Sequence, residues 1–135
     1  MAREEAAFRF RHPVDVRFRD IDAMGHAHHS LVLVYIEEAR SEYWRTVAGR
    51  PELDFIIGEI SLAYHRRILY PGTLSVGVRT TRLGRSSFDM DYELRDGDGE
   101  PVASGRSAQV MFDYAAGRPM PIPDELRRRL ERYEG

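Results

Sequence analysis

Hydrophobic and polar residues alternate in five stretches of the chain, the pattern that is typical of half-buried β-strands. The stretches cover residues 14–18, 60–68, 74–78, 88–94 and 101–112. Turns or short loops separate the last four, and one of them is Asp96-Gly-Asp-Gly99, whose residues tolerate the backbone of a tight turn. Consecutive strands joined in this way predict an antiparallel sheet.

The hydrophobic period changes to three or four residues between Ser30 and about Val47, which predicts a long helix. Its first half is apolar all round, so we expect that half to be buried on all sides. Ser30, or a residue one or two before it, is expected to cap the helix. A short second helix is expected after Pro121-Ile-Pro, with Asp124 as its N-cap and its arginines on a solvated face.

The order of these elements is strand, long helix, four strands and short helix, which fits a single α+β domain over residues 1–135. A helix that is buried on all sides has to be wrapped by the sheet. One sheet has two edges, and a protomer of this size cannot cover both, so pairing with a second copy is expected.

Composition and charge exclude several classes of function. The net charge of −2 gives no basic field for nucleic acid, and the absence of cysteine excludes disulfides, thiolate zinc sites and cysteine nucleophiles. All 20 basic residues are arginine, which excludes a Schiff-base lysine. The N-terminus has no apolar signal region and no apolar stretch is long enough to span a membrane, so a cytoplasmic location is predicted.

A dense polar cluster lies between the first strand and the long helix. Residues 19–30 hold two aspartates, one glycine and three histidines. Taken from spacing alone, Asp20 and Asp22 more often shape a turn or cap a helix than catalyse. A metal site is not predicted, because His28 and His29 are expected to face different ways and no metal-binding spacing supports them.

Four segments of the chain carry a resemblance to a known family. They are Phe18-Arg-Asp-Ile-Asp-Ala-Met-Gly-His26, Tyr35-Ile-Glu-Glu-Ala-Arg40, Tyr70-Pro-Gly-Thr73 and Leu83-Gly-Arg-Ser-Ser-Phe88. Together they resemble the hotdog-fold acyl-CoA thioesterases, and within these the 4-hydroxybenzoyl-CoA thioesterase and YbgC/FadM-like group. The resemblance implies an antiparallel five-stranded sheet wrapped around one long central helix.

The resemblance also implies roles for individual residues. Asp22 falls on the catalytic carboxylate, which acts as nucleophile or as general base, while Asp20 is expected to anchor the loop. The backbone N–H of His29 falls on the donor to the oxyanion, and its ring could orient water or the carbonyl. Gly25 would allow close approach of the substrate. Glu37 is a reserve catalytic candidate that could instead only form an ion pair with Arg40.

The coenzyme A site implied by the resemblance is the loop between the third and fourth strands, with Arg85, Ser86 and Ser87 as contacts. Arg66 and Arg67 form a second, weaker basic candidate.

The implied activity is hydrolysis of an acyl-CoA thioester to the free acid and coenzyme A, without any further cofactor. The implied assembly is a homodimer with the site at its interface, two dimers forming a homotetramer. The alternative is a non-catalytic protein on the same fold that binds acyl thioesters or serves in assembly.

Overall fold

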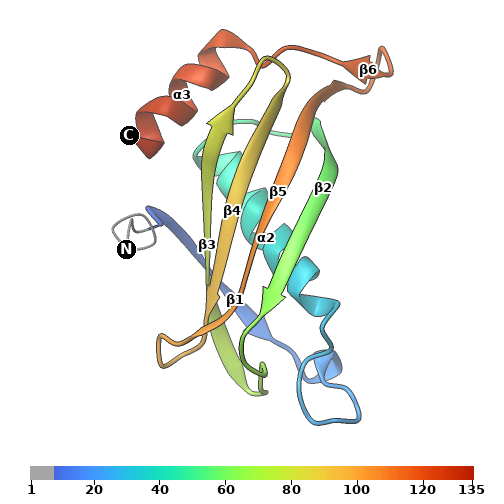
Figure 1. The fold of residues 1–135 in the computed structure, drawn as a ribbon, viewed down its shortest axis with the longest axis vertical. Coiled ribbons are helices and arrows are strands. Elements are labelled where there is room, and N and C mark those ends of the chain that lie inside the picture. Colours follow the sequence, from blue (N-terminus) through green and yellow to red (C-terminus); the bar gives the residue numbers. More distant parts are fainter. Residues whose placement is uncertain (1–7) are drawn as a thin grey trace.

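A computed structural model describes residues 8–135 of the chain, and within them the strands form one antiparallel sheet (Figure 1). The strands are β1 (Phe10–Val16), β2 (Phe55–Tyr64), β3 (Gly72–Leu83), β4 (Ser87–Arg95), β5 (Pro101–Asp113) and β6 (Arg118–Pro119). Their order is β1-β3-β4-β5-β2, and β6 pairs with β5. The expected five-stranded sheet was therefore wrong by one strand, because the two-residue β6 is too short to show alternation.

Two strands lie at other positions along the chain than their hydrophobic patterns predicted. β1 ends at Val16, and Phe18–Asp20 forms a 3₁₀ turn, η1, in place of the predicted strand end. β2 begins at Phe55 and ends at Tyr64, several residues before the predicted stretch of 60–68. The reason is that β2 is an edge strand with a register shift between Ile57 and Glu59, and most of its residues are exposed on both faces.

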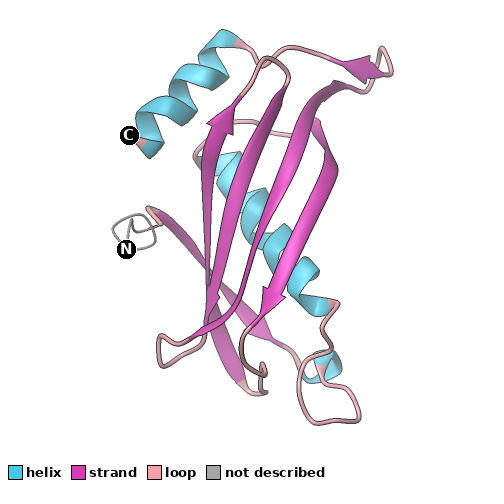
Figure 2. Ribbon diagram, viewed as in Figure 1, coloured by secondary structure: helices cyan, strands magenta, loops and turns pink. Residues whose placement is uncertain are grey.

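The long helix, α2 (Leu31–Thr46), packs against one face of the sheet (Figure 2). Its buried residues include Ile36 and Trp44, which share one core with inward-facing strand residues such as Met90. This apolar contact dominates the stability of the fold. The expectation that the first half of α2 is buried on all sides was wrong for the single chain, because Leu33 and Val34 are exposed.

The C-terminal helix, α3 (Asp124–Glu134), starts at the predicted place, although its N-cap is Pro123 and not Asp124. Leu126 and Leu130 bury one side of α3 in the core. The expected solvated arginine face was wrong in part, because Arg127 donates to the carbonyl of Gly84 at 2.7 Å and Arg129 to that of Val47 at 3.2 Å.

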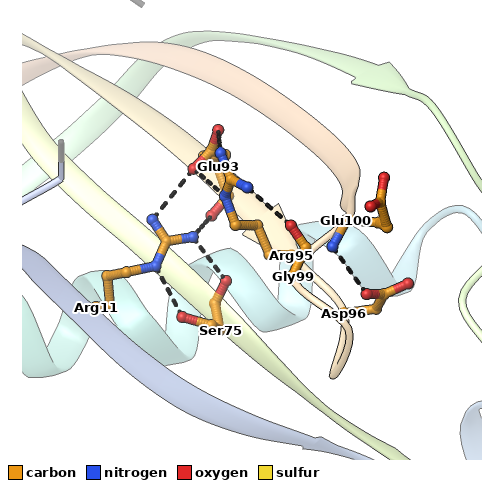
Figure 3. A network of polar contacts seen from close by, with 7 residues as sticks. All are labelled: Arg11, Ser75, Glu93, Arg95, Asp96, Gly99 and Glu100. Carbon is orange, nitrogen blue, oxygen red and sulfur yellow. Dashed lines mark hydrogen bonds and ion pairs between the residues drawn. The ribbon is translucent and has the colours of Figure 1, made fainter. Parts of the chain in front are cut away.

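The outer face of the sheet, turned away from α2, carries a network of charged side chains (Figure 3). Arg11 of β1 donates to the Ser75 hydroxyl at 2.7 Å and to the Glu93 carboxylate at 3.2 Å. Arg95 donates to the same carboxylate at 2.9 Å. These contacts tie β1, β3 and β4 together across the face that lacks a helix.

Among residues 8–135, no helix is both long enough and apolar enough to cross a membrane.

Candidate active site

The loop between β1 and α2 is anchored by Asp20, as the sequence predicted. Its buried carboxylate accepts a hydrogen bond from the Tyr35 hydroxyl at 2.7 Å and another from the Arg17 N–H at 2.9 Å. Its backbone carbonyl accepts the N–H of His28 at 3.2 Å. Burial, together with the hydrogen bond to Asp20, raises the pKa of Tyr35 well above its ordinary value, so this hydroxyl stays a donor. Asp20 therefore connects the start of the loop both to its end, at His28, and to α2, at Tyr35.

Asp22 occupies a tight turn within this loop. Its Oδ1 accepts the Met24 N–H at 2.9 Å, and its backbone carbonyl accepts the Gly25 N–H at 3.0 Å. Gly25 has a φ of +87°, a conformation that strains residues with a side chain, so the turn itself requires glycine. The other carboxylate oxygen, Oδ2, has no partner among the described residues. Asp22 thus shapes the turn with one oxygen and leaves the second one available.

Ser30 is the N-cap residue of α2, as the sequence predicted. Ser30 makes no side-chain capping bond, whereas Nδ1 of His28 accepts the Ser30 N–H at 3.2 Å. The rings of His28 and His29 lie side by side, with centroids 4.1 Å apart, so the expectation that they face different ways was wrong. Within residues 8–135 the N–H of His29 donates to no acceptor. A free N–H at a helix start is the donor type that binds anions.

Asp22 and His29 line one cavity of about 360 Å³. Its walls also include His26, Tyr64, Arg66 and Arg67. The residues that line the cavity therefore include one aspartate, three histidines and two arginines. Asp22 is the one acidic residue among those that line the cavity, and it lies there together with Arg66 and Arg67.

Tyr64 and His65 are cavity residues that the sequence reasoning did not single out for chemistry. They come from the end of β2 and the loop after it, and Tyr64 donates to the carbonyl of His29 at 3.1 Å. The alternation of the strand treated Tyr64 only as a core-facing position, yet its side chain is exposed. Arg66 and Arg67, the weaker basic candidate, do line this cavity, and Arg66 lies 3.6 Å from Glu100.

Glu37 does not line the cavity of Asp22. Its exposed carboxylate forms the expected ion pair with Arg40, at 3.9 Å. Arg40 itself is buried and donates to the Tyr92 hydroxyl at 3.1 Å. The ion-pair interpretation of Glu37 is thereby confirmed, and its reserve catalytic role stays a prediction.

The predicted coenzyme A loop lies at the other end of the sheet. The loop joins the end of β3 to the start of β4, while the loop of Asp22 lies beside the start of β3, where Val16 pairs with Gly72 (Figure 1). The carbonyls of Arg85 and Ser86 are held by the N–H groups of Ile122 and Met111, each at 2.8 Å, and the Arg85 side chain is exposed. Within one chain, Arg85, Ser86 and Ser87 therefore share no pocket with Asp22.

No group of three or more His, Cys, Asp or Glu side chains among residues 8–135 is arranged to hold a metal ion.

Comparison with known proteins identifies the family. The family model of the thioesterase-like superfamily matches residues 16–130. The chain belongs to the thioesterase-like superfamily.

Among solved structures, this superfamily member resembles a thioesterase from Thermus thermophilus, determined in complex with coenzyme A and zinc. The two are 37% identical with a TM-score of 0.84, over 93% of this chain and 93% of that one. A predicted thioesterase from Bacillus stearothermophilus is 27% identical with a TM-score of 0.84, over 92% of this chain and 95% of that one. YsmA of Bacillus subtilis (strain 168) is 25% identical over 93% of this chain and 88% of that protein. These matches confirm the expected α+β, hotdog-like class.

Proposed function

We propose that this member of the thioesterase-like superfamily hydrolyses an acyl-CoA thioester to the free acid and coenzyme A. The observation that carries the proposal is the shared cavity, which is lined both by Asp22, with its free oxygen, and by His29, with its unpaired N–H. A thioester carbonyl needs an attacking oxygen and a donor for the oxyanion that develops. The thioesterase from Thermus thermophilus, which was solved with coenzyme A, supports the choice of carrier group.

In the proposed mechanism, Asp22 removes a proton from water while the water oxygen attacks the carbonyl carbon. The backbone N–H of His29 stabilises the oxyanion, which then collapses and expels the thiolate, and the thiolate takes up a proton to leave as coenzyme A. In the other form of the reaction, Asp22 attacks directly and water hydrolyses the mixed anhydride.

We further propose that the chain belongs to the 4-hydroxybenzoyl-CoA thioesterase and YbgC/FadM-like group and works as a homodimer, paired into a homotetramer. Support for the pairing comes from exposed apolar residues on two elements. Leu33 and Val34 are exposed on α2, and Ile56 and Ile57 are exposed on the edge strand β2. An exposed apolar edge strand is a surface that proteins normally cover. A second copy would cover it and would add its own residues near the cavity.

The test is the Asp22→Asn variant, assayed for thiol release from a panel of acyl-CoA substrates. Asparagine keeps an oxygen for the Met24 N–H, so the turn is preserved while the carboxylate is lost. We expect kcat/KM to fall by at least about 100-fold, the usual scale of general acid–base catalysis. Activity within about tenfold of wild type would refute the role of Asp22. Wild-type protein that binds acyl-CoA and releases no thiol would favour the non-catalytic binding protein instead.

A further inference from the structure

Tyr64 contacts His29, the residue whose backbone N–H is the proposed donor to the oxyanion. It is the last residue of β2, and its hydroxyl donates to the carbonyl of His29 at 3.1 Å. Its ring also meets the His29 imidazole edge to face, with centroids 6.2 Å apart and planes at 86°. Both residues line the cavity of Asp22. One strand residue thus contacts the backbone and the ring of His29 together.

The start of α2 depends on contacts from outside the helix. Ser30 makes no capping bond through its side chain, so the first turn is not fixed in that way. Besides the local bond from the Leu31 N–H to the His28 carbonyl at 2.9 Å, two bonds tie this segment to the end of β2 and the loop after it. They are the Tyr64 hydroxyl on the His29 carbonyl and the Ala27 N–H on the Ile68 carbonyl, the latter at 2.8 Å. Between them they restrain the backbone rotations that aim the His29 N–H.

We propose that Tyr64 is a positioning residue for thioester hydrolysis, which keeps the His29 N–H at a fixed position relative to the Asp22 carboxylate. This inference rests on the proposed function, because it assigns the oxyanion to that N–H. An oxyanion donor works only if it is held close to its productive geometry, within about 0.5 Å. In this role the Tyr64 hydroxyl acts through the His29 carbonyl, to which it donates.

The chain offers a matched control for this hydroxyl. Tyr114 donates to the carbonyl of Phe55 at 3.1 Å and has an exposed fraction of 61%. Its bond therefore has the same type and length as that of Tyr64, but it lies at the other end of β2. Replacing either tyrosine by phenylalanine removes one hydroxyl and one bond to a backbone carbonyl, and leaves the ring in place.

The experiment compares Tyr64→Phe and Tyr114→Phe in thiol release from an acyl-CoA that the wild type hydrolyses. We expect Tyr64→Phe to lower kcat by about threefold to tenfold, the scale of one net hydrogen bond, with KM within about twofold of wild type. The pH dependence of kcat should not change, because Asp22 is retained. Tyr114→Phe should keep the wild-type kcat. Equal loss of kcat in both variants, or wild-type kcat in Tyr64→Phe, would overturn the inference.

Amide hydrogen exchange gives a readout that does not depend on activity. The Val32 N–H bonds to the same His29 carbonyl, at 3.3 Å, so its exchange reports on this turn. We expect exchange at Val32 to become several times faster in Tyr64→Phe and to stay unchanged in Tyr114→Phe. Unchanged exchange in Tyr64→Phe would overturn the inference even if the protein hydrolysed no thioester. A wild type that releases no thiol would refute the proposed function alone.

Discussion

Removing the Tyr35 hydroxyl should destabilise the protein by about 2 kcal/mol, because the hydroxyl donates to a buried carboxylate. Tyr35 has an exposed fraction of 2% and Asp20 of 7%, so water cannot replace the lost donor. Hydrogen bonds to charged groups contribute about 1.5–3 kcal/mol each. The Tyr35→Phe variant keeps the ring, and Asp20 keeps its bond from the Arg17 N–H, which places the expected loss in the lower half of that range.

Thermal unfolding followed by circular dichroism would measure this loss. With an unfolding entropy of about 2.1 cal/mol/K per residue, 135 residues turn about 2 kcal/mol into a fall in Tm of roughly 7 °C. Protein concentration has to be equal in all samples, because any association of chains would shift Tm by mass action. The functional consequence should be a loss of thioesterase activity at temperatures below the global transition, since Asp20 anchors the loop that carries Asp22.

Tyr133 provides the control for the loss of a hydroxyl. Its ring lies 6.2 Å from that of Tyr43, but its hydroxyl makes no hydrogen bond within the described part of the chain. Tyr133→Phe should therefore change the free energy of unfolding by less than about 0.5 kcal/mol. If Tyr35→Phe lowers Tm no more than Tyr133→Phe does, the bond to Asp20 does not stabilise the loop, and the anchoring role is refuted.

Two further predictions concern charged groups. Burial alone would raise the pKa of Glu93, but the hydrogen bonds and charges of Arg95 and Arg11 outweigh it and hold this pKa below its ordinary value. The ionised Glu93 therefore stabilises the fold above its unfolded-state pKa of about 4.3, and this stabilisation is lost as pH falls through the folded-state pKa. Glu93→Gln should lower the free energy of unfolding by about 1 kcal/mol at pH 7 and leave it unchanged at low pH. Measurements of Tm at each pH would check this. Arg85→Gln should weaken coenzyme A binding about tenfold by calorimetry and leave hydrolysis of an acyl-pantetheine, which lacks the nucleotide, unchanged. The control is Arg128→Gln, which replaces an exposed arginine of α3. Equal loss of hydrolysis for an acyl-CoA and the acyl-pantetheine would contradict a contact with the nucleotide.

The sequence predicted correctly those strands that have one face against the core and the other towards solvent. Phe88, Met90, Tyr92 and Leu94 alternate with polar residues, and β4 has its core face and its outer face where this pattern put them. β2 was placed wrongly because it lies at an edge, where neither face is fully covered and the alternation carries little information. The apolar start of α2 also led to a wrong prediction of burial on all sides, because Leu33 is apolar and still exposed in the single chain.

The candidate site likewise has one part that the sequence predicted and one part that it did not. Asp22 and His29 lie seven residues apart, between a strand end and a helix start, and the family resemblance implied that they share a site. Tyr64 is 35 residues away from His29, and their contact depends on which edge of the sheet β2 occupies. Alternation along a strand does not specify the order of strands in the sheet. The contact between Tyr64 and His29 could therefore be identified only from the three-dimensional fold.

The separation of Arg85 from Asp22 links the coenzyme A site to the assembly. β3 has 12 residues, which at about 3.3 Å each span about 40 Å between the two loops. No single side chain bridges that span, so Arg85 can contact a coenzyme whose thioester lies at Asp22 only from a second copy of the chain. Without such a copy, Arg66 and Arg67 are the cations within the cavity itself. A loss of coenzyme A affinity in Arg85→Gln would therefore support the homodimer as well as the contact, whereas an unchanged affinity would assign the phosphates to Arg66 and Arg67.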